Sequence, residues 1–193
     1  CVQKYSKSFH IVTADGGFDF TVNFNKQEVM ALRLIIAEVF TALAIQKKGG
    51  YFVLKVYDIF MRTTIEIIYM LCNMYESVFL YKPHTSRTAN SEKYIICKNM
   101  EYNITDQWIN AFDRFLSKLE NSPDYVIESI LDFELDHLFL TKMNDICSVI
   151  GQQQLDNISN TLSLILNPKN EKIESYKRNN IQQCISWCIK HDL

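Results

Sequence analysis

The sequence has almost no net charge. Its 20 Lys and Arg residues face 22 Asp and Glu residues over 193 positions, which leaves a formal charge of −2 at pH 7. A strongly basic protein attracts nucleic acid over its whole surface, and this balance excludes that mode of binding. Any nucleic-acid site must therefore be a local basic patch.

Long apolar runs and a disulfide framework are also missing. No apolar stretch reaches the ~18 residues of a membrane span, and we expect no signal peptide. The six cysteines are scattered through apolar runs, which predicts reduced, buried thiols in a cytosolic protein. The sequence shows no internal repeat and no low-complexity segment.

The sequence begins at Cys1 without a Met and enters a strand-like run as early as Phe9. We therefore expect a fragment of a longer protein. Its 193 residues, 48% of them apolar and 22% charged, suit a soluble globular domain with a helical extension.

Residues 9–98 alternate between strand-like and helix-like patterns. The strand-like runs are Phe9–Ala14, Tyr51–Val56, Ser77–Tyr81 and Tyr94–Cys97, and the helical periods cover Val29–Leu43 and Thr63–Met74. Alternating strands and helices predict an α/β fold: a mainly parallel sheet with helices on both faces. Asn25 could cap the first helix with Glu28 as its capping-box partner, and Gly49-Gly50 should end it.

The pattern becomes purely helical from about residue 105. Helical spacing covers Ile104–Leu119, Leu155–Leu166 and Ile173–Ile189, with a break at Asn167-Pro168. Ser122-Pro123-Asp124 predicts the start of a further helix that reaches Gly151, because Ser is a frequent cap and Pro suits the first helical position. We expect residues 101–193 to form an α-helical tail after a sheet domain at residues 1–100.

Three ionisable residues flank the strands. Asp15 follows the first strand, Lys55 lies near the end of the second, and Glu92 precedes the last. Ligands of open α/β sheets bind outside the carboxyl ends of the parallel strands. Only a short loop joins Tyr81 to Tyr94, so the last strand must return antiparallel and start at that same edge. The topology therefore predicts that the three side chains share one edge.

An Asp, a Lys and a Glu at one edge could take a proton from a hydroxyl group. A lysine is normally protonated, and nearby carboxylates raise its pKa, so Lys55 can act as a base only if burial or a second cation offsets them. Each residue also has a plain structural explanation. Asp15-Gly16-Gly17 could be a simple turn, Lys55 could extend to solvent, and Glu92 could be a surface charge.

Two further clusters of polar side chains stand out in the sequence. Lys82, His84, Arg87 and Lys93 surround the loop before Glu92, either as a basic patch or as ordinary solvated charge. Cys184, Cys188 and His191 share one helical face, but a zinc site needs a fourth ligand and usually tighter spacing, so we expect no metal.

With these residues in place, the chain resembles the FtsJ-like (RrmJ-type) ribose 2′-O-methyltransferase family, and most closely its mRNA-cap branch. The matching text is ADGGF (Ala14–Phe18), the segment Gln27–Phe60 and LYKPHTSRTANSEKYIICK (Leu80–Lys98). The last of these is long and compositionally unusual, and therefore specific. The resemblance implies a Rossmann-like methyltransferase sheet.

The resemblance also implies a function for the three residues. The family uses a Lys-Asp-Lys-Glu tetrad with S-adenosylmethionine as methyl donor. Asp15 matches its Asp, Lys55 its second Lys and Glu92 its Glu. Lys55 would be the base or close positioner of the ribose 2′-hydroxyl, with Asp15 and Glu92 orienting it. Asp15 and Gly16 would lie near the donor.

The resemblance implies an RNA partner, the capped mRNA 5′ end. The lack of a long apolar stretch leads us to expect no membrane partner. Phosphates would meet Lys82, His84, Arg87 and Lys93. The family's first Lys and its Gly-rich donor loop precede the Asp strand and have no counterpart here. We therefore expect either a longer parent protein or a chain inactive by itself.

Two alternatives stay open: a catalytically inactive domain of this fold that binds RNA or a protein, and a 2′-O-methyltransferase of ribosomal or transfer RNA. Richness in asparagine, isoleucine and lysine would suit a large DNA virus. We expect a cytoplasmic location, in a viral factory or virion for a viral protein, or the nucleus for a cellular one.

Overall fold

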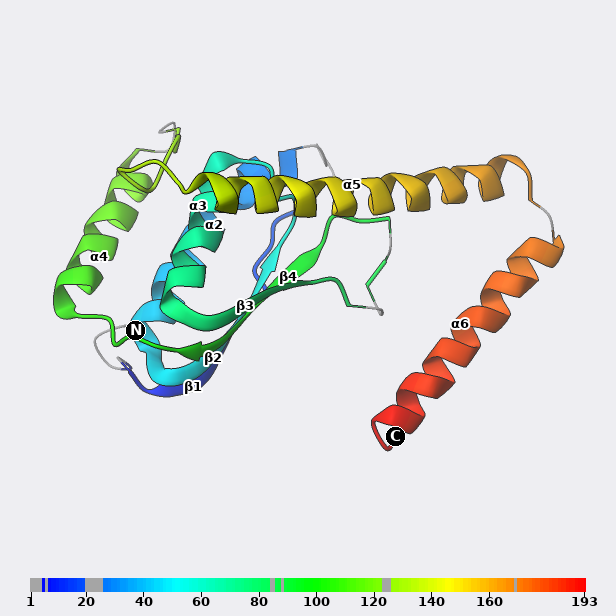
Figure 1. Cartoon of the computed structure of the whole chain (residues 1–193), viewed down its shortest axis with the longest axis horizontal. Coiled ribbons are helices and arrows are strands. Elements are labelled where there is room, and N and C mark those ends of the chain that lie inside the picture. Colours follow the sequence, from blue (N-terminus) through cyan, green and yellow to red (C-terminus); the bar gives the residue numbers. More distant parts are fainter. Residues whose placement is uncertain are drawn as a thin grey trace. The chain divides into compact units, whose positions relative to one another are not determined.

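The computed structural model describes residues 5, 7–19, 26–83, 86–87, 89–122, 126–168 and 170–193. A four-stranded sheet and its helices come first and long helices follow (Figure 1). The elements are β1 (Phe9–Ala14), α2 (Gln27–Ile45), β2 (Gln46–Val56), α3 (Arg62–Met74), β3 (Tyr75–Tyr81), β4 (Lys93–Met100), α4 (Asp106–Asn121), α5 (His137–Leu166) and α6 (Asn170–Lys190).

The sheet has the strand order β1-β2-β4-β3. β1 and β2 are parallel, whereas β4 runs antiparallel to both of its neighbours. The prediction that the last strand returns antiparallel beside β3 is therefore confirmed. β4 also lies between β2 and β3. The crossover through α3 leaves room for one strand between β2 and β3, and β4 fills this position.

Helices α2 and α3 cover one face of the sheet, so the expectation of helices on both faces is wrong for the described residues. The two crossovers, β1 to β2 and β2 to β3, move in the same direction across the sheet. Crossovers between parallel strands are almost always right-handed, so two crossovers in the same direction place both helices on the same face.

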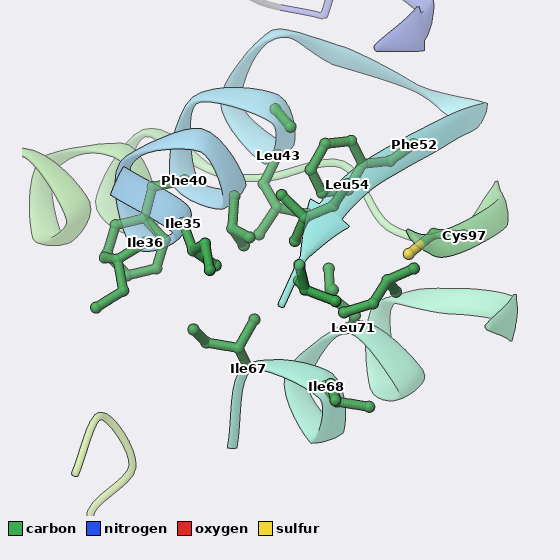
Figure 2. Packing of buried hydrophobic residues seen from close by; sticks show 14 of the residues in the cluster. Ile35, Ile36, Phe40, Leu43, Phe52, Leu54, Ile67, Ile68, Leu71 and Cys97 are labelled. Carbon is green, nitrogen blue, oxygen red and sulfur yellow. The ribbon is translucent and has the colours of Figure 1, made fainter. Parts of the chain in front are cut away.

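The hydrophobic core lies between the sheet and these two helices (Figure 2). Alternate residues of β2, namely Phe52, Leu54 and Val56, are 0% exposed, whereas Tyr51 on the opposite face is 46% exposed. This alternation is the period of a strand with one covered face. Figure 2 shows core side chains of α2 and α3 converging on the same strands: Ile35, Ile36, Phe40, Leu43, Ile67, Ile68 and Leu71.

Of the capping box predicted for α2, the structure describes only Glu28. α2 begins at Gln27, and its cap residue Lys26 makes no side-chain capping bond; Asn25 lies outside the described residues. Glu28 instead accepts hydrogen bonds from the backbone N–H groups of Phe60 at 3.1 Å and Met61 at 2.8 Å. Met61 is the cap residue of α3, so Glu28 fastens the start of α3 to α2.

The predicted helix start at Ser122-Pro123-Asp124 is also wrong. Pro123 and Asp124 lie outside the described residues, residues 126–136 are not helical, and α5 begins only at His137. The carboxylate of Asp136 accepts from the N–H groups of Leu138 and Phe139 and so caps α5. The preceding segment is irregular, and it is fastened to α3 because Glu66 accepts from the N–H groups of residues 130 and 131.

The expected helical tail is present, and its break at Asn167-Pro168 is confirmed, because α5 ends at Leu166 and α6 begins at Asn170. By packing, the chain separates into residues 1–149 and residues 150–193. The division at residue 100, expected from the change to a purely helical pattern, stays a prediction. Among the described residues, no helix is long and apolar enough to cross a membrane.

Candidate functional site

Asp15, Lys55 and Glu92 lie at one edge of the sheet. β1 ends one residue before Asp15, and its last residue is paired with Leu54 of β2, so Asp15 emerges beside Lys55. β4 begins one residue after Glu92 and runs antiparallel to β2. Strand direction and register therefore bring the three residues to the same edge, as the sequence predicts.

Lys55 and Asp15 form a close ion pair. The Nζ atom of Lys55 lies 2.6 Å from Oδ1 of Asp15 and donates a further hydrogen bond of 3.1 Å to the backbone carbonyl of Asp15. The lysine side chain is only 14% exposed, whereas the Asp15 side chain is 70% exposed. Asp15 thus holds the lysine from the solvent side of the edge.

The charges around Lys55 favour its protonated form. Burial by itself would lower the pKa of Lys55, but the hydrogen bond that Lys55 donates to Asp15 and the electrostatic effects of Tyr57, Asp15 and Tyr94 outweigh it, so the pKa is raised above its ordinary value. In this arrangement Lys55 is an ammonium group that can orient an oxygen atom. Acting as a base would require a further positive charge beside it.

Glu38 of α2 is a fourth ionisable group at this edge. Its Oε1 accepts a 2.9 Å hydrogen bond from the backbone N–H of Gly16. Burial raises the pKa of Glu38, the Gly16 bond and the charge of Lys55 lower it, and the charge of Asp15 raises it; the net pKa is above its ordinary value. Glu38 therefore anchors the turn that carries Asp15 and belongs to the same electrostatic cluster.

The two glycines of this turn leave little room for a side chain. A Cβ atom on Gly17 would lie 3.0 Å from the hydroxyl oxygen of Tyr57 and 3.6 Å from Nζ of Lys55. On Gly16 it would run into the side chains of Glu38 and Leu34. The turn can approach the lysine this closely because both residues are glycines.

Tyr94 links Glu92 to the ion pair. Tyr94 is the register partner of Lys55 across β2 and β4, so both side chains emerge on the same face. Its hydroxyl group lies 3.4 Å from Oε1 of Glu92. Burial and the charges of Glu92 and Asp15 raise the pKa of Tyr94, while the charge of Lys55 lowers it. Tyr94 is therefore coupled to all three predicted residues.

The basic residues predicted around the Glu92 loop have different surroundings. Lys93 is 3% exposed, and its Nζ donates to the carbonyls of Ser91 at 2.7 Å and Tyr57 at 3.1 Å and lies 3.6 Å from Asp58. Lys82 is half-buried and bonded to the loop itself. Both ammonium groups are directed into the protein in this arrangement.

Arg87 is exposed, and phosphate contact by this residue stays a prediction. His84 lies outside the described residues. In the part of the chain that the structure describes, no group of three or more His, Cys, Asp and Glu side chains could hold a metal ion. Cys184 is exposed and Cys188 half-buried on α6, so neither is the core thiol expected from the sequence.

The residues of the turn fit a cationic methyl donor in one respect. The carboxylates of Asp15 and Glu38 present negative charge at the same turn, which suits a sulfonium cation. The N–H of Gly16, however, is bonded to Glu38. Asp15 and Gly16 are the two residues predicted to lie near the methyl donor. Asp15 therefore presents an exposed charged group to it, whereas Gly16 only leaves space because it has no side chain.

Sequence reasoning missed Glu38 and Tyr94. The signal for Tyr94 was present, because an antiparallel last strand puts the residue two places after Glu92 on the face of Lys55. Glu38 has no such signal. Helical periodicity places it in α2 but does not show which turn of the helix passes the loop after β1.

Comparison with known proteins gives a family match and similar relatives. The model of the family described as FtsJ-like methyltransferase matches residues 2–100. A Caenorhabditis elegans protein named cap-specific mRNA (nucleoside-2′-O-)-methyltransferase 1 is 38% identical over 141 residues, which is 69% of this chain and 15% of the relative. The Caenorhabditis briggsae protein named inactive cap-specific mRNA (nucleoside-2′-O-)-methyltransferase 1B is 32% identical over 152 residues, 75% of this chain and 18% of the relative.

A crystal structure of a Plasmodium falciparum protein described as a putative ribosomal RNA methyltransferase is 21% identical, with a TM-score of 0.41 over 49% of this chain and 48% of that one. This chain spans less than a fifth of the length of the curated relatives named above, 15% and 18%.

Proposed function

Since this chain belongs to the FtsJ-like methyltransferase family, we propose that its site acts as an S-adenosylmethionine-dependent RNA ribose 2′-O-methyltransferase on the mRNA cap. The observation that carries the proposal is the ion pair of Lys55 with Asp15 at the same sheet edge as Glu92. A half-buried lysine held by an exposed carboxylate can orient a hydroxyl oxygen.

S-adenosylmethionine, when bound, supplies a methyl group on a sulfonium sulfur. Lys55 would bind the ribose 2′-oxygen through its ammonium group, and Asp15 would keep that group in place. Holding the reacting oxygen in line contributes a large part of the rate in such a transfer. Glu92 and Tyr94 would complete the polar wall on the β4 side.

The hydroxyl proton must also leave the oxygen during the reaction. Because the pKa of Lys55 is raised by its neighbours, Lys55 accepts this proton only when a second positive charge is close by. The bound donor is itself a cation and would lie beside Asp15. Positioning is thus the first role of Lys55, and proton acceptance depends on the occupied site.

The cap is the proposed substrate because relatives that share 32% to 38% identity carry cap-specific names. The alternative substrate is ribosomal or transfer RNA. Transfer to capped and uncapped RNA of the same sequence distinguishes the two: a clear preference for capped RNA supports the proposal, and equal rates favour the alternative.

A non-catalytic domain that binds RNA or a protein is the second candidate. One relative with a similar match is named inactive, which favours it. Binding of S-adenosylmethionine by the longest natural form of the chain, measured by calorimetry, separates the two functions. Saturable binding supports the enzyme, and a lack of binding supports the second candidate. A viral source and the cellular location stay predictions.

Replacement of Lys55 tests the assignment directly. Lys55→Ala should abolish methyl transfer by the longest natural form while circular dichroism and the unfolding midpoint stay near those of the wild type. Lys98→Ala is a matched control, because Lys98 is an exposed lysine of β4 on the same face of the sheet. Near-normal transfer by Lys55→Ala would remove Lys55 from the reaction.

A further inference from the structure

The loop between β3 and β4 has to place Glu92 at the site. It covers residues 82–92 and joins two antiparallel strands. Among the described residues of this loop, two backbone hydrogen bonds stabilise it locally, from the N–H of Ser86 to the carbonyl of Pro83 at 3.0 Å and from the N–H of Asn90 to the carbonyl of Arg87 at 3.3 Å. A loop of this length needs further contacts to hold its last residue in one position.

Lys82 at the base of the loop provides these contacts. Its Nζ lies 2.9 Å from the carbonyl oxygen of Asn90, 2.7 Å from Oδ1 of Asn90 and 2.9 Å from the carbonyl oxygen of Glu92. A lysine ammonium has three N–H donors, and these three acceptors match that number. The first residue of the loop is thereby fastened to two residues near its end, Asn90 and Glu92.

The same contacts continue to the carboxylate of Glu92. The hydroxyl oxygen Oγ of Ser86 lies 3.4 Å from Oδ1 of Asn90 and 3.2 Å from Oε1 of Glu92. Oδ1 of Asn90 also accepts from Lys82. Glu92 is thus held at its carbonyl by Lys82 and at its carboxylate by Ser86 and Tyr94. Replacing Lys82 would remove the bond to the Glu92 carbonyl and the bond to Asn90, whose side chain also contacts Ser86.

We propose that Lys82 is a positioning residue that fixes Glu92 at the catalytic edge, and that it makes no direct contact with RNA phosphate. This inference rests on the proposed function for the role of Glu92, but the contacts of Lys82 do not depend on it. Burial and the charge of Lys93 lower the pKa of Lys82, with Glu92 opposing them, as suits an inward-facing ammonium group.

Salt dependence of RNA binding separates this role from a phosphate contact. A lysine that neutralises one phosphate contributes about 1 to the slope of log affinity against log salt. Lys82→Met should leave the slope unchanged, whereas Arg87→Gln, the exposed comparison in the same loop, should lower it by about 1 if Arg87 touches a phosphate. A slope that falls by about 1 in Lys82→Met would overturn the proposal.

Methyl transfer and loop order complete the test. In the longest natural form, Lys82→Met should lower kcat by about 10- to 100-fold with a small change in KM for RNA, because misplacing a reacting group costs that much. Lys82→Arg should not restore kcat, since a planar guanidinium cannot direct three donors from one nitrogen to these acceptors. Full rescue by arginine would indicate a role for the charge alone and overturn the proposal.

Hydrogen exchange at the amides of Ser86 and Asn90 gives a readout that does not require activity. It should be faster in Lys82→Met than in the wild type and unchanged in Arg87→Gln. Asn90→Ala removes only one of the three acceptors of Lys82, so its exchange rate should lie between those of the wild type and Lys82→Met. This graded result distinguishes the loss of loop contacts from a general folding defect in Lys82→Met. Unchanged exchange in Lys82→Met would contradict the proposal. An inactive wild type with the expected exchange would count against the proposed function alone.

Discussion

The ammonium group of Lys55 lies 2.6 Å from a carboxylate oxygen of Asp15, and it also donates to the backbone carbonyl of Asp15 at 3.1 Å. Two bonds from one side chain fix both the lysine and the turn that follows β1. The same pair decides the protonation of Lys55, because the carboxylate stabilises the ammonium form.

Asp15→Asn should shift the pH dependence of methyl transfer. The variant loses the carboxylate that raises the pKa of Lys55, so Lys55 should release its proton at lower pH. If neutral Lys55 accepts the hydroxyl proton, the acid limb of the kcat profile moves to lower pH, although the maximal rate falls. Asp113→Asn is the control, because Asp113 is an exposed residue of α4. An acid limb that stays in place in Asp15→Asn would show that Lys55 does not set it.

Glu38→Gln should separate the hydrogen bond of Glu38 from its charge. The raised pKa of Glu38 means that its ionised form is disfavoured in the folded state, chiefly by burial. Glutamine keeps an acceptor for the Gly16 N–H but carries no charge. Glu38→Gln should therefore be more stable than the wild type at pH 7, and this difference should shrink as the pH falls through the pKa of Glu38.

Denaturant titrations of Glu38→Gln at several pH values provide the measurement. Glu38→Leu is the comparison variant, since it removes both the charge and the acceptor and leaves the Gly16 N–H without its partner. It should be less stable than Glu38→Gln throughout. Equal stabilities of the two variants would contradict a structural role for the Gly16 bond.

Gly17→Ala should impair the site with little change in folding. The new Cβ atom would press on the hydroxyl of Tyr57 at 3.0 Å and lie 3.6 Å from Nζ of Lys55. We expect a loss of methyl transfer with a nearly unchanged unfolding midpoint. Gly151→Ala is the matched control, because a Cβ atom there would meet nothing within 4 Å apart from the adjacent backbone of its own helix α5. It should stabilise the helix by about 0.5–1 kcal/mol.

Leu71→Ala should weaken the core of the sheet unit. Leu71 of α3 is 0% exposed and packs into the cluster shown in Figure 2. Loss of a buried leucine side chain costs about 2–5 kcal/mol of unfolding free energy. Leu162→Ala on α5, where the leucine is 53% exposed, should change stability by less than ~0.5 kcal/mol. Chemical denaturation measures both, and similar losses would contradict the assigned core.

Much of the site was predictable from strand order. Asp15, Lys55 and Glu92 reach one edge because a short loop forces the last strand to return antiparallel, and that argument needs only the pattern of apolar runs. The position of both helices on one face followed from the direction of the crossovers. Sequence alone did not show that direction, because it does not give the order of strands in the sheet.

Other features depend on contacts between distant segments. Glu28 satisfies a capping-box pattern in the sequence. In the structure it accepts a hydrogen bond from the N–H of Met61, at the start of α3 and 33 residues further along the chain. Glu66 and the segment near residue 130 similarly displace the start of α5 beyond Ser122-Pro123-Asp124. Lys82 and Lys93 look like surface charges in sequence but have their acceptors inside the fold. Local patterns give no information on such partners.

The most direct test of the proposed function uses two capped RNAs that differ only at the first transcribed nucleotide, one with ribose and one with 2′-deoxyribose. Transfer of a labelled methyl group from S-adenosylmethionine by the longest natural form is measured for both. The account predicts label on the ribose RNA, none on the deoxyribose RNA, and none on either with Lys55→Ala. Equal labelling of the two RNAs, or no labelling of either by the wild type, would contradict it.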